Sequence, residues 1–266
     1  MHCCAAGKLA WLSSSRRDTE PGGFSLIEMS IVLFIVALLL GGLLPTVSSQ
    51  IEQQKRTETR KQLDEIQQAL IGYAVTYGRL PCPATETSNG VEKFDATPGT
   101  PANGLCETYY NGFVPAMTLG IATGVDIQGK KGFAVDAWGN RIRYAVSKED
   151  VGTSLRAFTS TDGMKTATLS SLASSTLNPL YICESTSAST TNCDTAITLT
   201  NKAPALVFSL GQNGAIIPPT GADEIINTDD NKVFVSHGNT PTFDDMVVWI
   251  SPNILINRMV AAGKLP

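Results

Sequence analysis

The most constraining feature of the sequence is a long apolar run with a carboxylate near its start. Residues 29–44 are apolar except for Ser30. A helix over residues 24–45 would have about 22 residues and a length of about 33 Å, close to the thickness of a bilayer's hydrocarbon core. Glu28 lies inside this stretch, where burial of a charge is costly. The sequence therefore predicts one transmembrane helix whose carboxylate takes part in assembly.

The residues before the apolar run resemble a processing signal. Gly23 precedes Phe24, and Glu28 is the fifth residue counted from Phe24. This pattern resembles the class III signal of type IV pilins and type II secretion pseudopilins, although Ser25 stands where threonine is usual. In that family a prepilin peptidase cuts after the glycine and methylates the new N-terminal phenylalanine. The resemblance implies cleavage between Gly23 and Phe24 and N-methylation of Phe24.

Glu28 has two interpretations. An ionised carboxylate in lipid needs a positive partner, and the new α-amine of Phe24 on a neighbouring subunit is a candidate. Such pairing would set the axial stagger of subunits in a filament. The alternative is an ordinary signal anchor in which Glu28 reaches the lipid headgroups.

Residues 1–23 are expected to be a cytoplasmic leader that is removed. Lys8, Arg16 and Arg17 precede the apolar run, and positive charges there keep this end of a chain in the cytoplasm. An ordinary secretory signal is disfavoured, because the apolar run follows the Gly23–Phe24 junction and is too long. The resemblance implies a single-pass protein of the bacterial inner membrane, with its head in the periplasm or on a surface filament.

The charge of the chain argues against nucleic acid as a partner. The whole chain has 20 Lys+Arg and 24 Asp+Glu, and three of the basic and two of the acidic residues belong to the leader. The rest is therefore acidic, and no basic cluster stands out in the sequence. Such a surface is a poor trap for phosphate backbones.

The cysteines divide between the leader and the mature chain. Cys3 and Cys4 lie in the leader, and four others remain in a part expected to face an oxidising compartment. Sequential pairing is favoured among the three connectivities, because it closes two short, polar loops. Zinc is the competing interpretation, but Cys-x-x-Cys spacing is lacking and the mature chain has one histidine, His237. The expected disulfides join Cys82 with Cys106 and Cys183 with Cys193.

The predicted fold class is α+β, with a long N-terminal helix packed on an antiparallel β-sheet head. Residues 46–78 should continue the transmembrane helix as an amphipathic one, with a kink at Pro45 and an end at Gly78 and Pro81. A break into two helices at residues 41–45 is the alternative. The helix should carry charge pairs between Arg60 and Asp64 and between Glu52 and Arg56. Its apolar stripe should consist of Leu63, Ile66, Leu70, Tyr73 and Tyr77.

Residues 79–266 are expected to form the globular head. A short helix is predicted within residues 114–121, and a last helix should begin at Ser251–Pro252, with the serine hydroxyl as its cap, and end at Gly263. Strands are predicted at residues 205–210, 233–235 and 246–250, and residues 132–146 should form two strands around a tight bend at Gly139–Asn140. Within that bend, Asp136, Trp138, Gly139 and Asn140 resemble the Asp-x-Trp-Gly-Asn segment of major pseudopilins.

Calcium is the one cofactor that the sequence suggests. Asp229 and Asp230 form one pair of hard oxygen ligands, and Asp244 and Asp245 form another. The resemblance adds that major pseudopilins hold calcium in a late loop of the head. Solvated turns are the alternative explanation.

Enzymatic activity is not expected. Residues 124–131 approach a phosphate-binding loop, but Lys131 stands where a hydroxyl should bind Mg²⁺. A Ser-His-Asp site would need His237, and no Gly-x-Ser-x-Gly turn presents a nucleophile.

The sequence thus predicts a pilin-like structural subunit. The favoured role is in a type II secretion pseudopilus, with a minor pilin of a type IV pilus or a membrane-anchored binding or adhesin module as alternatives. The partners that the resemblance implies are the prepilin peptidase, other pilin or pseudopilin subunits, an inner-membrane assembly platform and membrane lipid.

Overall fold

A computed structural model of the protein describes residues 23–96, 99–151, 155–167, 180–186, 189–216 and 218–265, with only the backbone described for residues 40–47. Apart from Gly23, the predicted leader lies outside the described residues. The chain divides into two compact units, Met1–Gln50 and Ile51–Pro266, and each is described by itself.

Helix α1, Leu26–Tyr77, is the first and longest element. It is assigned as one helix, as the sequence predicts, rather than as two. The predicted kink at Pro45 falls on residues whose side chains are outside the description. The predicted end is confirmed: Gly78 has φ +72°, in the left-handed region that favours glycine, and its N–H donates to the carbonyl of Ala74 at 2.8 Å.

The part of α1 in the second unit packs its apolar stripe into the main core. Leu63, Ile66, Leu70 and Tyr73 are buried as predicted, but Tyr77 is 58% exposed. Gly78 ends the helix directly after Tyr77, whose ring contacts that of Tyr73 at a tilt of 34°, with ring centroids 4.3 Å apart. The positions that complete the buried stripe are Ile71 and Ala74.

One of the two predicted charge pairs on α1 forms. Arg60 Nε lies 3.8 Å from Asp64 Oδ1 on the wet face. Glu52 and Arg56 are not paired with each other; the prediction is wrong because both side chains reach across to the head. The Glu52 carboxylate accepts a bond from the indole of Trp138, and Arg56 donates to the side chain of Asn239.

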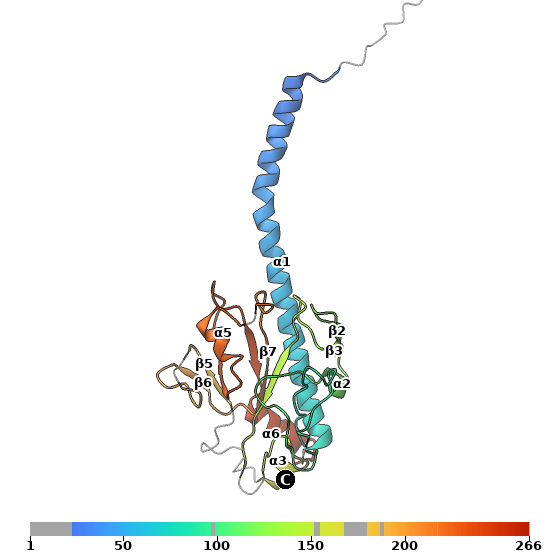
Figure 1. Cartoon of the computed structure of the whole chain (residues 1–266), viewed down its shortest axis with the longest axis vertical. Coiled ribbons are helices and arrows are strands. Elements are labelled where there is room, and N and C mark those ends of the chain that lie inside the picture. Colours follow the sequence, from blue (N-terminus) through green and yellow to red (C-terminus); the bar gives the residue numbers. More distant parts are fainter. Residues whose placement is uncertain are drawn as a thin grey trace, which may run out of the picture. The chain divides into compact units, whose positions relative to one another are not determined.

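A four-stranded antiparallel sheet forms the centre of the head. Its order is β1-β4-β7-β9, from β1 (Gly112–Phe113), β4 (Arg143–Val146), β7 (Ala205–Ser209) and β9 (Met246–Trp249). Every residue of β7 is buried, and its side chains alternate between two cores. Val207 joins the core that contains α1, and Phe208 joins the core on the opposite face. Figure 1 shows β7 between α1 and the strands β5 and β6.

The opposite core is closed by a second sheet of order β6-β5-β8. It contains β5 (Tyr181–Cys183), β6 (Thr198–Thr200) and β8 (Val233–Val235). Phe234 of β8 meets Phe208 of β7 edge to face, with ring centroids 5.6 Å apart. The pair β5–β8 is parallel, so the head is not purely antiparallel as predicted. The long connection between these two strands makes the parallel crossover possible.

The segment around Trp138 bends as predicted, but its strands pair elsewhere. Strand β3 (Lys131–Phe133) forms an antiparallel hairpin with β2 (Gly124–Val125), whereas β4 lies between β1 and β7. A single bridge, Val135 to Arg141, joins the two arms of the bend. The Gly139–Asn140 turn therefore connects two sheets rather than closing one hairpin.

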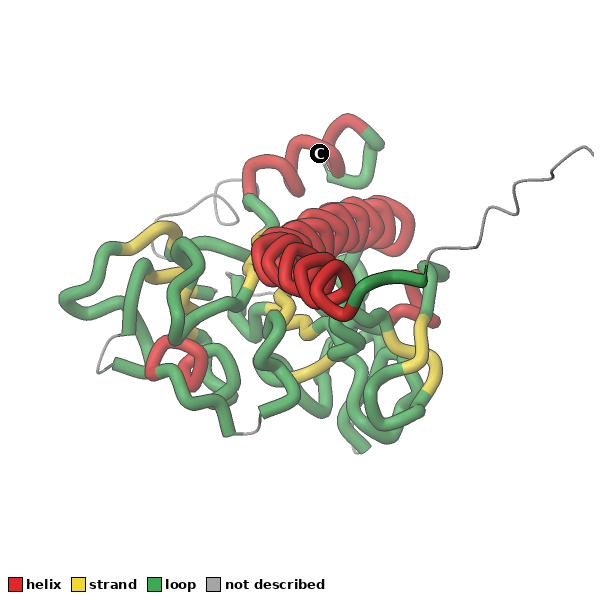
Figure 2. The backbone as a smooth tube through the Cα atoms, turned by 90° about the horizontal axis from the view of Figure 1, so that it is seen from above, coloured by secondary structure: helices red, strands yellow, loops and turns green. Residues whose placement is uncertain are grey.

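Four short helices complete the described head: α2 (Ala116–Leu119), α3 (Gly163–Thr166), α5 (Ala222–Ile226) and α6 (Pro252–Ala261). Helices α2 and α6 lie where the sequence predicts helices. Pro252 opens α6, but the Ser251 hydroxyl makes no capping bond, which differs from the prediction. Leu255 and Met259 bury α6 in the core that contains α1, and Figure 2 shows α6 beside that helix, near the C-terminal end.

Both disulfides are present in the predicted sequential pairing. Cys82 is bonded to Cys106 across 24 residues, and Cys183 is bonded to Cys193 across 10 residues. The first closes the connector that follows α1, and the second closes the loop after β5. A buried ion pair between Arg79 and Glu92, at 2.7 Å, fastens the same connector.

Candidate functional site

Helix α1 begins with a reciprocal cap. The backbone N–H of Ser25 donates to Glu28 Oε2 at 2.8 Å, and the N–H of Ile27 donates to Ser25 Oγ at 3.4 Å. The first N–H groups of a helix lack partners within the helix, and a Ser-x-x-Glu sequence satisfies two of them with side chains. Residues 25–28 carry the sequence signal of a capping box, a role of Glu28 that the prediction from its charge did not include.

The predicted cleavage bond lies directly before this cap. Gly23, Phe24 and Ser25 precede the helix in non-helical conformation, and the Phe24 side chain is 83% exposed. A Cβ added to Gly23 would meet no atom within 4 Å. The bond between Gly23 and Phe24 is thus uncovered by the rest of the described chain.

From Ile31 to Leu39, α1 carries only apolar residues. Each large apolar side chain from Phe24 to Leu39 is at least 42% exposed. A helix that is hydrophobic all round is normally buried, and a large exposed apolar surface marks an interaction site. A search over the described side chains, which leave out residues 40–47, finds no helix long and apolar enough to cross a membrane.

A second site is an acidic cluster in the head. Glu224 on α5 meets Asp244 and Asp245, the two residues that precede β9, and the carboxylate oxygens of the three lie within 4.8 Å of one another. The backbone N–H of Asp244 donates to Glu224 Oε1 at 3.1 Å, and the Nδ2 group of Asn213 donates to both Glu224 oxygens at 2.8 and 3.0 Å. The loop after β7, the helix α5 and the start of β9 therefore meet here.

Asp245 is the most perturbed group of the cluster. Its side chain is buried, and Oδ2 accepts a bond from Asn227 Nδ2 at 2.7 Å. Burial, with smaller contributions from Glu224 and Asp244, raises the pKa of Asp245 to about 8. Oδ1 of Asp245 and Oδ1 of Asp244 are both buried without a hydrogen-bond partner. Two acceptors thus remain unsatisfied in one small volume.

The chemistry of the cluster fits a hard divalent cation. Calcium takes carboxylate and carbonyl oxygens, and both unsatisfied atoms are carboxylate oxygens. Of the four predicted calcium ligands, the structure brings together only Asp244 and Asp245. Asp229 and Asp230 belong to the turn before β8, where the Asp229 carboxylate accepts bonds from Asn231. The third acid is Glu224, which was not predicted because its proximity to Asp244 and Asp245 depends on the packing of α5.

The Asp-x-Trp-Gly-Asn segment has a structural role. Asp136 Oδ1 accepts the N–H groups of Trp138 and Asn140, both at 2.9 Å, and Oδ2 accepts the hydroxyl of Ser209 at 2.6 Å. Gly139 has φ +87°, which side chains rarely adopt. Because Trp138 donates to Glu52 at 3.3 Å, the turn fastens β7 to the part of α1 in the head.

The structure gives residues 124–131 and His237, the two sequence features considered for an enzyme, other contacts. Residues 126–130 form the turn between β2 and β3, and the Asp126 carboxylate takes the N–H groups of Gln128 and Lys130, which a bound phosphate would need. His237 stacks on Phe243, with ring centroids 3.9 Å apart, and its Nε2 lies 3.1 Å from Asp223.

Comparison of the chain with protein-family models, curated proteins and solved structures finds no match. The fold and the sites define a class of protein: it has a disulfide-bonded α+β head and a long helix that begins with a cap and carries exposed apolar side chains.

Proposed function

We propose that the chain is the precursor of a pilin-like filament subunit. Prepilin peptidase would cut it between Gly23 and Phe24 and methylate the new amine of Phe24. The mature helix would lie in the bacterial inner membrane, with the head in the periplasm, until an assembly platform adds the subunit to a filament. The force for assembly would come from that platform, and the chain itself would perform no catalysis.

The observation that carries this proposal is the start of α1. An uncovered Gly23–Phe24 bond is followed at once by a capped helix with an exposed apolar surface. A peptidase needs access to the bond, and a filament core needs helices that bury apolar side chains against copies of themselves. Glu28 would then serve twice, as a cap within its own helix and as a carboxylate for the amine of the subunit added next.

Within this class we favour a subunit of a type II secretion pseudopilus. Asp136, Trp138, Gly139 and Asn140 form a turn that joins α1 to the sheet, and their sequence resembles that of major pseudopilins. A minor pilin of a type IV pilus would use the same helix and stays the alternative. A membrane-anchored adhesin would not need Glu28 for function.

The acidic cluster would hold one calcium ion in this subunit. Glu224, Asp244 and Asp245 would supply carboxylate oxygens, and the ion would neutralise charges that are buried between α5 and β9. Its role would be to fix the loops of the head rather than to act in chemistry.

The deciding experiment compares the membrane-extracted protein from cells with and without an active prepilin peptidase. Intact mass and N-terminal sequencing should give a chain that begins at N-methylated Phe24 only when the peptidase is active. A Gly23→Ala variant should stay unprocessed, and a Gly22→Ala variant, one residue outside the bond, should be processed normally. A chain that keeps residues 1–23 in both strains, or is cut elsewhere, would refute the proposal.

A further inference from the structure

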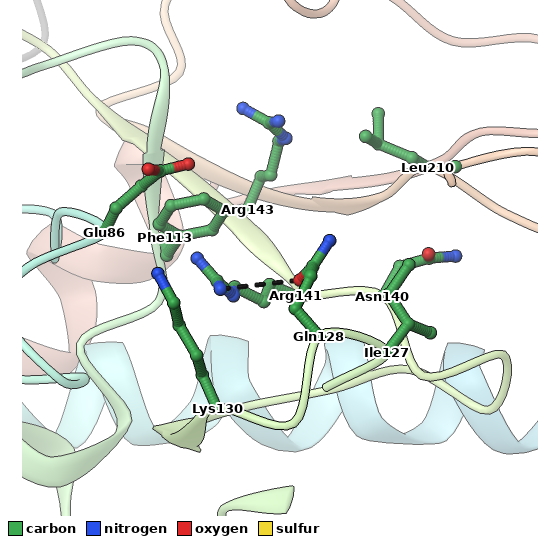
Figure 3. A pocket seen from close by; sticks show the side chains of 10 residues that line it. Glu86, Phe113, Ile127, Gln128, Lys130, Asn140, Arg141, Arg143 and Leu210 are labelled. Atoms are coloured by element: carbon green, nitrogen blue, oxygen red, sulfur yellow. Dashed lines mark hydrogen bonds between the residues drawn. The ribbon is translucent and has the colours of Figure 1, made fainter. Parts of the chain in front are cut away.

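A pocket in the head gathers basic side chains in a chain that is acidic as a whole. Its volume is about 280 Å³. Lys130, Arg141 and Arg143 line it, and the structure brings them together from the β2–β3 turn, the Trp138 bend and β4. Figure 3 shows the three cationic groups around Phe113, with Glu86 opposite Arg143 and with Ile127 and Leu210 at the other end.

Arg143 is a half-buried cation that forms no ion pair with any residue that the structure describes. Its guanidinium donates to the side-chain oxygen of Asn111 and lies 5.3 Å from the centre of the Phe113 ring. Its Nε atom is buried and has no hydrogen-bond partner. Burial lowers the pKa of Arg143 even though Asp245 and Glu86 oppose this effect. Because arginine stays charged in proteins, the pocket carries a positive charge that the protein neutralises only in part.

Arg141 and Lys130 line the same pocket, but only the charge of Arg141 is compensated by an ion pair among the described residues. Arg141 forms an ion pair with the buried carboxylate of Asp126 and lies over the Phe113 and Phe133 rings, so its charge is compensated. Lys130 is exposed, and no side chain among the described residues forms an ion pair with its amine. Lys130 is therefore free to close on a ligand that Arg143 attracts.

The charge balance identifies the kind of ligand. The lining has three cations and one carboxylate, that of Glu86. Because Asp126 compensates Arg141, Lys130 and Arg143 exceed Glu86 by about one positive charge within the lining, and Asp245, which is not a lining residue, opposes part of the charge of Arg143. Glu86 at the rim would repel a dianion more strongly than a monoanion. The apolar side chains of Ile127 and Leu210 offer a surface to a small carbon body beside the charge.

We propose that this pocket binds a small monocarboxylate, with the acid group between Arg143 and Lys130 and the carbon body against Ile127 and Leu210. The carboxylate could belong to a free acid or to an acidic side chain of a second copy of the chain. The site does not depend on the filament role.

The test uses the purified full chain in detergent micelles and two probes of equal shape, 3-methylbutanoate and its neutral amide. Calorimetric titration should show that the acid binds and the amide does not. Lys130→Met should weaken binding of the acid about tenfold or more, which corresponds to about 1.4 kcal/mol, and Arg143→Gln should abolish it. Lys165→Met, which removes another exposed lysine, should bind like the unaltered chain.

A second measurement separates the two sources of the carboxylate. Sedimentation of the full chain with and without the acid shows whether the acid disrupts self-association. If the acid disrupts self-association, the site binds an acidic side chain of a second copy. If the acid binds and self-association is unchanged, the site binds a free acid. Three results would overturn the proposal: equal binding of acid and amide, absence of binding, or an unchanged affinity in Lys130→Met. None of them requires that Arg143→Gln folds.

Discussion

Glu28 accepts a hydrogen bond from the backbone N–H of Ser25 at 2.8 Å. This bond places the carboxylate one residue away from the nitrogen that cleavage after Gly23 would turn into an α-amine. The carboxylate thus has a partner within its own helix before any second subunit arrives. Two roles of Glu28, capping and charge, can therefore be separated by substitution.

Glu28→Gln should retain the cap and lose the charge, because glutamine also caps a helix at this position. We expect the variant to be processed at Phe24 and to remain in the membrane, but not to enter filaments. Ser25→Ala should lose about 1 kcal/mol of helix-end stability and still assemble. The readout is the amount of each variant in filaments after cross-linking. Assembly of Glu28→Gln at the normal level would show that the cap is the important role and that the charge is not.

Stability should fall as pH rises, through Asp245. The pKa of this carboxyl is raised from 3.8 to about 8 in the folded chain. Between these two values the unfolded chain has released the proton and the folded chain still holds it. The free energy of unfolding should therefore decrease from about pH 4 to about pH 8, by at most about 1.4 kcal/mol per pH unit. Urea unfolding of the full chain in micelles without calcium, at a series of pH values, measures this slope.

The matched variants for this slope are Asp245→Asn and Asp194→Asn. Asparagine at position 245 keeps an oxygen for Asn227 and cannot ionise, so the slope should flatten. Asp194 is exposed and lies far from the cluster in sequence, so its replacement should leave the slope intact. An equally steep decline in Asp245→Asn would contradict the assignment.

Calcium should reverse this loss of stability. The ion needs ionised carboxylates, so it competes with the proton on Asp245 and stabilises the folded chain most above neutral pH. At a calcium concentration of about 100 times the Kd, binding should add about 2.7 kcal/mol to the free energy of unfolding. Each kcal/mol corresponds to a rise of about 2 to 4 °C in Tm for a chain of this size. Thermal unfolding after dialysis against a chelator, with and without added calcium, tests this. Glu224→Gln should lose the response, whereas Asp229→Asn should keep it; an equal response in both would exclude the cluster as the calcium site.

Much of the head could be predicted because its signals are local. Gly78 ends α1 by its left-handed conformation, and Pro252 begins α6. A single residue therefore predicts each of these two helix boundaries. The sequential disulfides follow from short loops. Strands β7 and β9 are continuous apolar runs between turns, which is typical of strands that are buried on both faces.

The sites were less predictable because they depend on packing between distant segments. Glu224 reaches Asp244 only through the position of α5, and no spacing in the sequence signals this pair. Lys130 comes from the β2–β3 turn and Arg143 from β4, and no spacing in the sequence predicts that they line one pocket. Tyr77 fits the period of the α1 stripe and is still exposed, because the chain leaves the core one residue later.

The two disulfides should contribute unequally to stability, because they restrict loops of different length in the unfolded chain. The loop-entropy relation gives about 3.5 kcal/mol for the 24-residue separation of Cys82 and Cys106 and about 2.7 kcal/mol for the 10-residue separation of Cys183 and Cys193. Replacing both cysteines of a pair by serine, followed by urea unfolding of the full chain in micelles, compares them. The Cys82–Cys106 variant should also free the connector that holds the Arg79–Glu92 pair. The difference in free energy of unfolding between the two variants should therefore be larger than the difference that loop entropy alone predicts. A larger loss in the Cys183–Cys193 variant would mean that the second sheet, rather than the connector, limits the stability of the head.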